Sequence, residues 1–307
     1  MENEIKIFCP ATIANLNCGF DVMGLCIESI GDEMIIRKVA EKGIRITKIT
    51  GADLPFETEK NVAGVAGLAL LHATQCDFGF EIEIHKKIKA GSGIGSSSAS
   101  ASGAVFGINE LLGNPFTKHE LIDFAMKGEA IASGCEHADN VAPCILGGFT
   151  LVRGYNPLDV IKIKSPTDLY AVVLHPHIEV KTSDSRAVLS PTILLKNAIM
   201  QWGNLGGLIA GLYSNDYELI GRSLQDVIIE PMRKHLIPNF DEVKKNALQN
   251  GALGSGISGA GPSIFALCKG QTIAEKVAFS MRNAYLATGI PYDIHISKVN
   301  DEGTKII

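Results

Sequence analysis

The segment that most constrains the fold is a glycine and serine run, GSGIGSSS at residues 91–98, which lies between a strand pattern and a helix pattern. The strand pattern, FEIEIH at residues 80–85, alternates apolar and polar side chains, as a half-buried β-strand does. Backbone amides at the start of a helix bind phosphate because they are unpaired and lie at the positive end of the helix dipole. Gly91, Gly93 and Gly95 permit positive φ angles and close backbone approach. The run therefore predicts a phosphate-binding loop, with a merely flexible loop as the alternative.

Two common nucleotide-binding loops do not match this run. The Walker A pattern requires Lys and then Ser or Thr directly after its last glycine, whereas Gly95 is followed by Ser96. The dinucleotide-binding pattern GxGxxG requires a glycine where Ser96 stands, and no acidic residue ends a second strand about 20 residues later. A Walker-type site and a Rossmann oxidoreductase are therefore poor fits.

Short β-branched runs alternate with longer helical patterns along the chain, which indicates a mixed α and β architecture. The early strand patterns are separated by turn residues rather than helices, which favours antiparallel pairing. Strands are predicted at residues 5–9, 22–27, 33–39, 43–49, 80–85, 148–152, 170–175, 263–268 and 292–299. Helices are predicted after the glycine loop, from Asn61 as N-cap to residue 75, and at residues 118–133, 191–214 and 272–287.

The chain has 307 residues, more than the roughly 100 to 200 of a usual domain, so the length favours two lobes or one large α/β unit. Residues 154–167, GYNPLDVIKIKSPT, place two prolines between patterned regions and are the best candidate for a boundary. The prediction is one lobe over residues 1–156 and a second over residues 157–307.

Composition excludes several classes of protein. The formal net charge is −5 and no basic run is present, so nucleic acid is not an expected partner. The start, MENEIKIFCP, lacks the basic and then apolar order of a secretory signal, and the apolar stretch Val62–Cys76 is shorter than the roughly 20 residues of a membrane span. None of the seven cysteines forms a CxxC pair. We therefore expect reduced thiols, no membrane partner and a cytoplasmic location.

Three segments resemble the GHMP kinase superfamily, in order and over nearly the whole chain. CPATIANLNCGFDVMGLCI at residues 9–27 is similar to the first motif of its homoserine kinase family, PATSANLGxGFDxLG. The glycine loop resembles the superfamily pattern PxxxGLGSSA, with Lys89 in place of proline, Ile94 in place of leucine and Ser98 in place of alanine. GALGSGISGAGPSIFALC at residues 251–268 is similar to the glycine-rich closing motif, again in its homoserine kinase form.

The resemblance implies an α+β fold with two lobes. The N-terminal lobe would be of the ribosomal protein S5 domain 2 type, the C-terminal lobe ferredoxin-like, and the active site would lie between them. The implied reaction is transfer of the ATP γ-phosphate to the side-chain hydroxyl of L-homoserine on the route to threonine, with Mg²⁺ as cofactor and a homodimer as the assembly. The alternatives are a kinase of the same superfamily for mevalonate, a sugar or shikimate, and a non-catalytic member that senses its ligands.

Phosphoryl transfer requires positioning and charge stabilisation around the metal and the phosphates. The resemblance assigns Mg²⁺ to Ser97 and Glu129, although a lone helix glutamate is more often solvated. Their presence argues against a non-catalytic member. The resemblance also implies that ATP contacts Asn61, Gly91, Ser92, Gly93, Ile94, Gly95, Ser96, Ser97, Ser98 and Thr182. Asn61 needs no ligand if it serves only as a helix N-cap.

Recognition of an amino acid requires a cationic group for its carboxylate and an acceptor for its ammonium group. By resemblance, Arg186 and Arg233 would bind the carboxylate and Asp21 the ammonium group. Several relatives that act on mevalonate or galactose carry an aspartate base where Asn140 stands. Asn140 can position the substrate hydroxyl but cannot take its proton as a carboxylate would. The substrate pocket is predicted to contain Asn15, Asp21, His137, Asp139, Asn140, Arg186 and Arg233, and the catalytic residues are Ser97, Glu129 and Asn140.

Two further pairs are assigned no role. Lys86 and Lys87 precede the loop, but paired lysines at a strand end are usually solvated. His175 and His177 lack a third metal ligand, so we expect ordinary surface or core histidines.

Overall fold

The computed structural model describes residues 3–74, 76–134 and 136–307, and its strands form two separate sheets. The first sheet has the order β11-β1-β2-β4-β3, with β5 paired to β2 and β6 paired to β5. Its strands are β1 Glu4–Ala14, β2 Met23–Val39, β3 Gly43–Thr50, β4 Gly79–His85, β5 Phe149–Tyr155, β6 Leu158–Ile163 and β11 Lys305–Ile306. The second sheet has the order β10-β7-β9-β8, with β7 Leu169–Pro176, β8 Gly254–Ile257, β9 Ile264–Lys269 and β10 Tyr292–Lys298.

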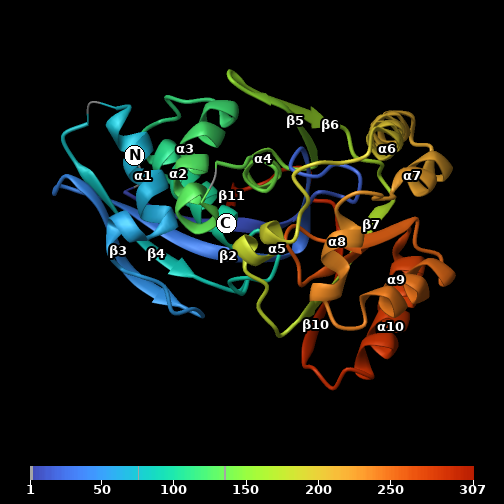
Figure 1. The fold of residues 1–307 in the computed structure, drawn as a ribbon. Helices are drawn as coiled ribbons and strands as arrows, with labels where there is room; N and C mark the ends of the chain where they lie inside the picture. The colour runs from blue at the N-terminus through green and yellow to red at the C-terminus, as the bar shows by residue number, and fades with distance from the viewer. Residues whose placement is uncertain (1–2, 75, 135) are drawn as a thin grey trace.

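The helices divide between the two sheets (Figure 1). α1 Val62–His72, α2 Ser96–Leu111, α3 Lys118–Ser133 and α4 Val141–Leu146 pack together with the first sheet. α9 Phe240–Gln249 and α10 Gln271–Leu286 pack on the second sheet. Between α4 and α9 the chain forms α5 Thr182–Ala187, α6 Leu195–Ser214, α7 Tyr217–Ser223 and α8 Glu230–Arg233. 3₁₀ turns lie at Thr58–Lys60 and Lys234–Leu236. No described helix has both the length and the apolar character that a membrane crossing requires.

Close packing of α2 on the first sheet brings the phosphate loop to its position. α2 is rich in small residues, and nearly all of them are buried. A Cβ atom on Gly107 would lie 2.4 Å from Ile36 Cδ1, and one on Gly103 would lie 2.4 Å from Cys9 Sγ. Side chains at these positions would push α2 off the sheet, so the small residues set the height of the loop above β1 and β2.

Most predicted elements are confirmed, but the pairing of the early strands differs from the prediction. The strands predicted at residues 22–27 and 33–39 form one strand, β2, which begins at Met23. Gly31 allows the backbone to continue beside the Phe8 ring, whose nearest atom is only 2.4 Å from where a Cβ would lie. β1 and β2 pair antiparallel as expected, whereas β3 pairs parallel with β4, which contradicts the antiparallel expectation for that strand.

Helix ends follow local capping. Asn61 is the N-cap of α1, and its side chain accepts a hydrogen bond from the Ala63 amide at 3.0 Å, as predicted. α1 ends at His72, before the predicted end at residue 75, which lies outside the described residues. α6 begins at Leu195 rather than at residue 191. The short elements α4, α5, α7, α8, α9, β6, β8 and β11 were not predicted.

The predicted lobe boundary falls in the turn of a hairpin. β5 and β6 are joined at Asn156 and Pro157, and both belong to the first sheet. The chain passes to the second sheet between Ile163 and Leu169, and it returns at its end, where β11 pairs with β1. The division at residues 156 and 157 therefore stays a prediction.

Candidate active site

The phosphate loop has the backbone conformation that its glycines predict. Gly91, Gly93 and Gly95 have φ angles of 67°, 78° and 73°. A Cβ atom on Gly95 would lie 2.1 Å from Thr12 Oγ1, and one on Gly93 would lie 2.5 Å from the Gly261 carbonyl oxygen. The loop is thus held close to both β1 and the closing glycine motif, and it leads directly into α2 at Ser96.

A cavity of about 710 Å³ opens over this loop and over the start of α2. Every residue predicted to contact ATP lines it except Ile94, whose side chain is buried in the core. Its lining also includes residues to which no role was assigned, namely Lys86, Ile131, Glu179, Lys181, Gly259, Ala260 and Gly261. The glycines among them belong to the third sequence motif, which was recognised without roles for single residues.

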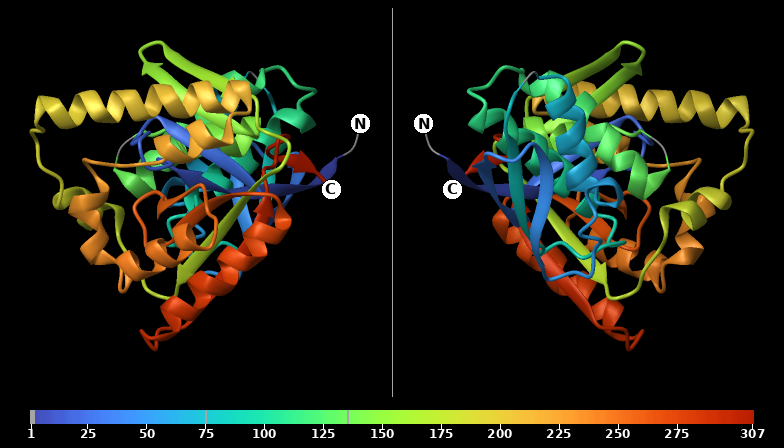
Figure 2. Two further views of the ribbon diagram at one scale, coloured as in Figure 1. Left: turned by 90° about the vertical axis from the view of Figure 1, so that its right-hand side faces the viewer. Right: turned by 90° about the vertical axis from the view of Figure 1, so that its left-hand side faces the viewer.

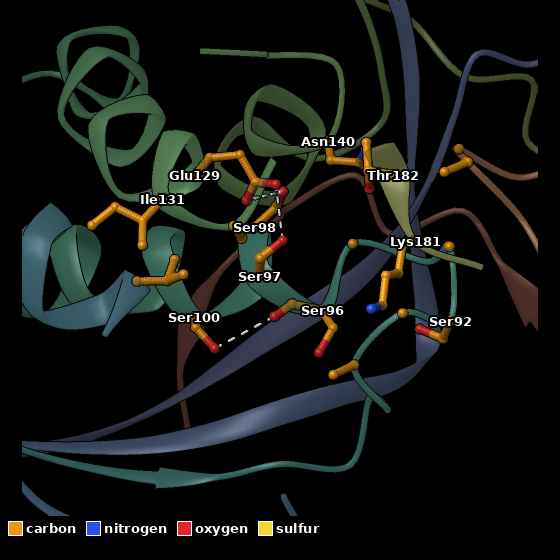
Figure 3. A pocket seen from close by; sticks show the side chains of 18 of the residues that line it. Ser92, Ser96, Ser97, Ser98, Ser100, Glu129, Ile131, Asn140, Lys181 and Thr182 are labelled. Atoms are coloured by element: carbon orange, nitrogen blue, oxygen red, sulfur yellow. Dashed lines mark hydrogen bonds between the residues drawn. The ribbon is translucent and has the colours of Figure 1, made fainter. Parts of the chain in front are cut away.

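Glu129 from α3 reaches the start of α2 (Figure 3). Its two carboxylate oxygens accept hydrogen bonds from Ser97 Oγ at 2.9 Å and from Ser98 Oγ at 3.0 Å. Burial raises the pKa of Glu129 to about 7, although both serine hydroxyls act in the opposite direction. The predicted pair of Ser97 and Glu129 is therefore in direct contact at the edge of the cavity.

The donor set at Glu129 fits Mg²⁺ bound through a nucleotide. The described residues contain no group of three or more His, Cys, Asp or Glu side chains that could hold a metal ion without help. Mg²⁺ is usually bound by one or two carboxylates together with substrate phosphates and water. One carboxylate and a serine hydroxyl beside a phosphate-binding loop match that pattern.

Lys86 contradicts its prediction as a solvated residue. Its side chain is 2% exposed, and Nζ donates to Asp32, to the Ser96 carbonyl oxygen at 2.7 Å and to Ser100 Oγ at 3.1 Å. Alternation along the chain turns Lys86 toward α2 and Lys87 toward solvent, where Lys87 pairs with Glu33. Lys86 therefore ties the first turn of α2 to the buried carboxylate of Asp32.

A second, smaller cavity of about 80 Å³ adjoins the first. All seven residues predicted for the substrate pocket line it: Asn15, Asp21, His137, Asp139, Asn140, Arg186 and Arg233. The two cavities share Ser98, Glu129, Asn140, Thr182, Gly259 and Ala260. The predicted phosphate and amino-acid sites are therefore continuous, and they meet at Glu129.

Two arginines dominate the charge of the smaller cavity. Arg186 Nη2 donates to both carboxylate oxygens of Asp21, at 2.8 and 3.0 Å, and to His137 Nε2 at 2.9 Å. Because His137 accepts this bond at Nε2, it is neutral here, and burial lowers its pKa. Arg233 donates to the Ser185 carbonyl oxygen at 2.9 Å, and burial lowers its pKa to about 10.

The Phe20 ring lies beside both arginines. Its centroid is 5.7 Å from Cζ of Arg186 and 4.9 Å from Cζ of Arg233. Both distances are within the range of a cation–π interaction. Sequence reasoning assigned Phe20 no role, although it directly precedes Asp21 in the first motif.

Asn140 and Asp139 lie next to the junction of the two cavities. Asn140 Oδ1 accepts a hydrogen bond from Thr12 Oγ1 at 2.6 Å, which fixes the orientation of the amide. Asp139 is buried, and burial raises its pKa to about 7, with the negative charges of Asp21 and Glu129 acting in the same direction.

The closing motif joins the loop to the second sheet. Ser258 Oγ donates to the Gly93 carbonyl oxygen at 2.7 Å, and Ser263 Oγ donates to the Ser92 carbonyl oxygen at 2.6 Å. His175 lies buried with Nδ1 3.2 Å from Ser263 Oγ, whereas His177 contacts Asp293 near the surface. The third motif therefore supports the loop from the side opposite α2.

Comparisons with known proteins agree with this geometry. The chain matches the GHMP kinases N terminal domain over residues 40–148 and the GHMP kinases C terminal domain over residues 208–287. It is 46% identical to the homoserine kinase of Chlorobium phaeobacteroides over 98% of each chain, and 44% identical to that of Chlorobaculum tepidum over 98% of this chain and 97% of the relative.

Solved structures give the same result. The chain is similar to the crystal structure of homoserine kinase from Cytophaga hutchinsonii, with a TM-score of 0.97 and 51% identity over 100% of this chain and 98% of that one. A mevalonate kinase structure, at 14% identity and a TM-score of 0.71 over 98% of this chain and all of that one, shares the fold. These findings confirm the predicted GHMP kinase fold. The chain therefore belongs to the homoserine kinase family of the GHMP kinase superfamily.

Proposed function

We propose that this protein transfers the γ-phosphate of ATP to the side-chain hydroxyl of L-homoserine and forms O-phospho-L-homoserine in threonine biosynthesis. The observation that carries the proposal is the junction at Glu129 of a phosphate-binding cavity and a small cavity with two arginines and Asp21. The names of the relatives reported above agree with this substrate.

In this proposal the loop amides and the start of α2 bind the ATP phosphates, and Ser97 and Glu129 hold Mg²⁺. When bound, the metal ion neutralises charge on the phosphate oxygens during transfer. Lys86 keeps the first turn of α2 in place, since it bonds the Ser96 carbonyl oxygen. Thr182 lines both cavities and would contact the phosphate near the point of transfer.

The amino acid would lie in the smaller cavity with its carboxylate on Arg186 and Arg233 and its ammonium group on Asp21. Asn140 would hold the hydroxyl beside the γ-phosphate, with Thr12 fixing the amide. The substrate oxygen bonds to the γ-phosphorus as the bond to the β–γ bridging oxygen breaks and ADP leaves. Asn140 cannot take the hydroxyl proton as a carboxylate would, and in this proposal the proton passes directly to an oxygen of the transferred phosphoryl group.

The proposal includes a homodimer, as the family resemblance implies. It also includes a cytoplasmic location, because ATP and free amino acids are available there. The reaction itself is tested by Mg²⁺-dependent ADP release with L-homoserine, L-serine, L-threonine, mevalonate, galactose and shikimate. Selective turnover of homoserine is expected. Preference for another compound would overturn the roles of Arg186, Arg233 and Asp21, and no turnover at all would favour a ligand-sensing protein.

A matched variant tests the metal site. Glu129→Gln keeps the size of the side chain but removes the carboxylate, so turnover should be lost while nucleotide affinity stays within about tenfold. Retained turnover would exclude Glu129 from the transfer step.

A further inference from the structure

α6 presents an apolar surface that its own chain does not cover. Besides Met200, six large apolar side chains on this helix and on the segment before it are each 50–67% exposed: Ile193, Leu194, Leu195, Ile199, Trp202 and Tyr213. Trp202 is the only tryptophan in the sequence. Figure 2 shows α6 along the upper edge of the molecule, with its N-terminal end at a corner. An apolar patch of this kind on a folded chain typically marks an interaction site.

The spacing on α6 is that of a helix that packs against another helix. The stripe consists of Leu195, Ile199, Trp202, Gly206, Ile209 and Tyr213, with alternating steps of four and three residues. This is the a and d pattern of a coiled-coil seam. The side of α6 that faces its own molecule is different and buries Ala198, Gln201, Leu208, Gly211 and Leu212. α6 therefore carries two packing faces. The rest of the chain covers one of them and reaches the stripe at Ile209, which is partly buried against the core.

We propose that this stripe binds the same stripe of a second copy of the chain, with the two α6 helices antiparallel about a twofold axis at the level of Asn204. In this register Trp202 lies against the partner's Gly206, Ile199 against the partner's Ile209, and Leu195 against the partner's Tyr213. A Cβ atom at Gly206 or at Gly203 would meet no atom of its own chain within 4 Å. The glycines thus leave open space for the largest side chain of the opposing helix.

Charge and area favour a second copy over another partner. α6 has one charged side chain, Lys196, and the stripe has none. A partner with an acidic or basic surface would therefore form no ion pair with the stripe. The stripe is complementary to itself at each of its three pairs. If the six exposed side chains, of which Ile193 and Leu194 flank the stripe, each cover ~100 Å², the pair removes ~1,200 Å² in total, which reaches the lower limit of a specific interface.

This proposal specifies the contact surface of the homodimer that the proposed function includes. It does not depend on the kinase activity. Sedimentation equilibrium of the full chain tests it, with ADP release from ATP in the presence of homoserine as a separate check on folding. The wild type is expected to be a dimer at micromolar concentration. Trp202→Ala removes the large side chain, and Gly206→Trp places two tryptophans face to face, so each should weaken the dimer at least tenfold.

The double variant W202A/G206W distinguishes this register from any other use of α6. Each introduced tryptophan again faces a small residue of the partner, so dimerisation should recover. Met200 is 53% exposed on α6 but lies off the stripe. Met200→Ala is therefore the control and should leave the molar mass of the assembly at that of the dimer. A monomeric wild type, single variants that remain fully dimeric, or a double variant as monomeric as the singles would overturn the proposal.

Discussion

The two cavities that meet at Glu129 are lined by different kinds of groups. The larger cavity takes seven of its lining residues from one continuous segment, residues 91–98, which contributes backbone atoms and small side chains. The amino-acid cavity takes charged side chains from the loop after β1, from the segment before α4, from α5 and from α8. A site lined by backbone atoms depends on the residues that hold its loop in place. A site lined by charged side chains depends on each of those side chains. Substitutions should therefore be able to impair one cavity without impairing the other.

The largest effect is expected from the support behind the loop. Lys86→Met leaves the buried Asp32 carboxylate without its cation, so the free energy of unfolding should fall by about 3–5 kcal/mol. Urea denaturation measures this change. Lys87→Met, which removes an exposed pair with Glu33, is the control and should cost about 1 kcal/mol or less. Equal effects of the two variants would show that Lys86 does not act as a buried partner.

Arg186→Met should affect the amino-acid cavity alone. It removes the partner of Asp21 and of the substrate carboxylate, so kcat/KM for homoserine should fall by about 30- to 1,000-fold, equivalent to about 2–4 kcal/mol. The KM for ATP should stay within about twofold, because the loop does not involve this side chain. Arg153→Met, on the exposed hairpin, is the control. A parallel loss of ATP affinity would contradict the separation of the cavities.

The pH dependence of stability should report on the buried carboxylates near the junction. Burial raises the pKa of Glu129 from 4.5 to about 7 and that of Asp139 from 3.8 to about 7. The folded state therefore binds more protons than the unfolded state in this range, and stability falls as the pH rises from about 4 to 7, by at most about 1.4 kcal/mol per unit for each group. Denaturation of the wild type and Glu129→Gln at several pH values tests this. Identical slopes would contradict the role of Glu129.

The smallest effect is expected at Phe20. Phe20→Leu keeps an apolar side chain but removes the ring beside Arg186 and Arg233, so the KM for homoserine should rise by about two- to fivefold. Phe20→Tyr keeps the ring and should restore the wild-type value. Failure of tyrosine to restore it would point to packing rather than to the interaction with the guanidinium groups.

Local features of the chain could be predicted because their causes are local. The positive φ angles of the phosphate loop follow from its glycines, and the N-cap of α1 follows from Asn61. Lys86 could not be placed, because its partner Asp32 lies 54 positions away and paired lysines look the same whether solvated or buried. The bond between Thr12 and Asn140 spans 128 positions and has no local signal.

The short helices of the amino-acid site escaped prediction for a related reason. α5 and α8 have six and four residues, too few for an apolar period to appear. Their arginines were placed in the pocket by resemblance to a family, and the structure brings both into one cavity with Asp21. Side-chain contacts that form only through tertiary packing are therefore the features of the site that sequence patterns do not predict.

The ion pair between Arg186 and Asp21 has a consequence for selectivity. The two groups neutralise each other. With the proposed substrate roles, a zwitterion would therefore enter by exchanging partners, its carboxylate replacing Asp21 and its ammonium group replacing Arg186. The net charge of the cavity stays constant through this exchange. A simple amine or a simple acid would have to break the same pair and leave one member without a partner in a partly buried site. With these proposed roles the cavity would select against a simple amine and a simple acid, although it holds a group that attracts each.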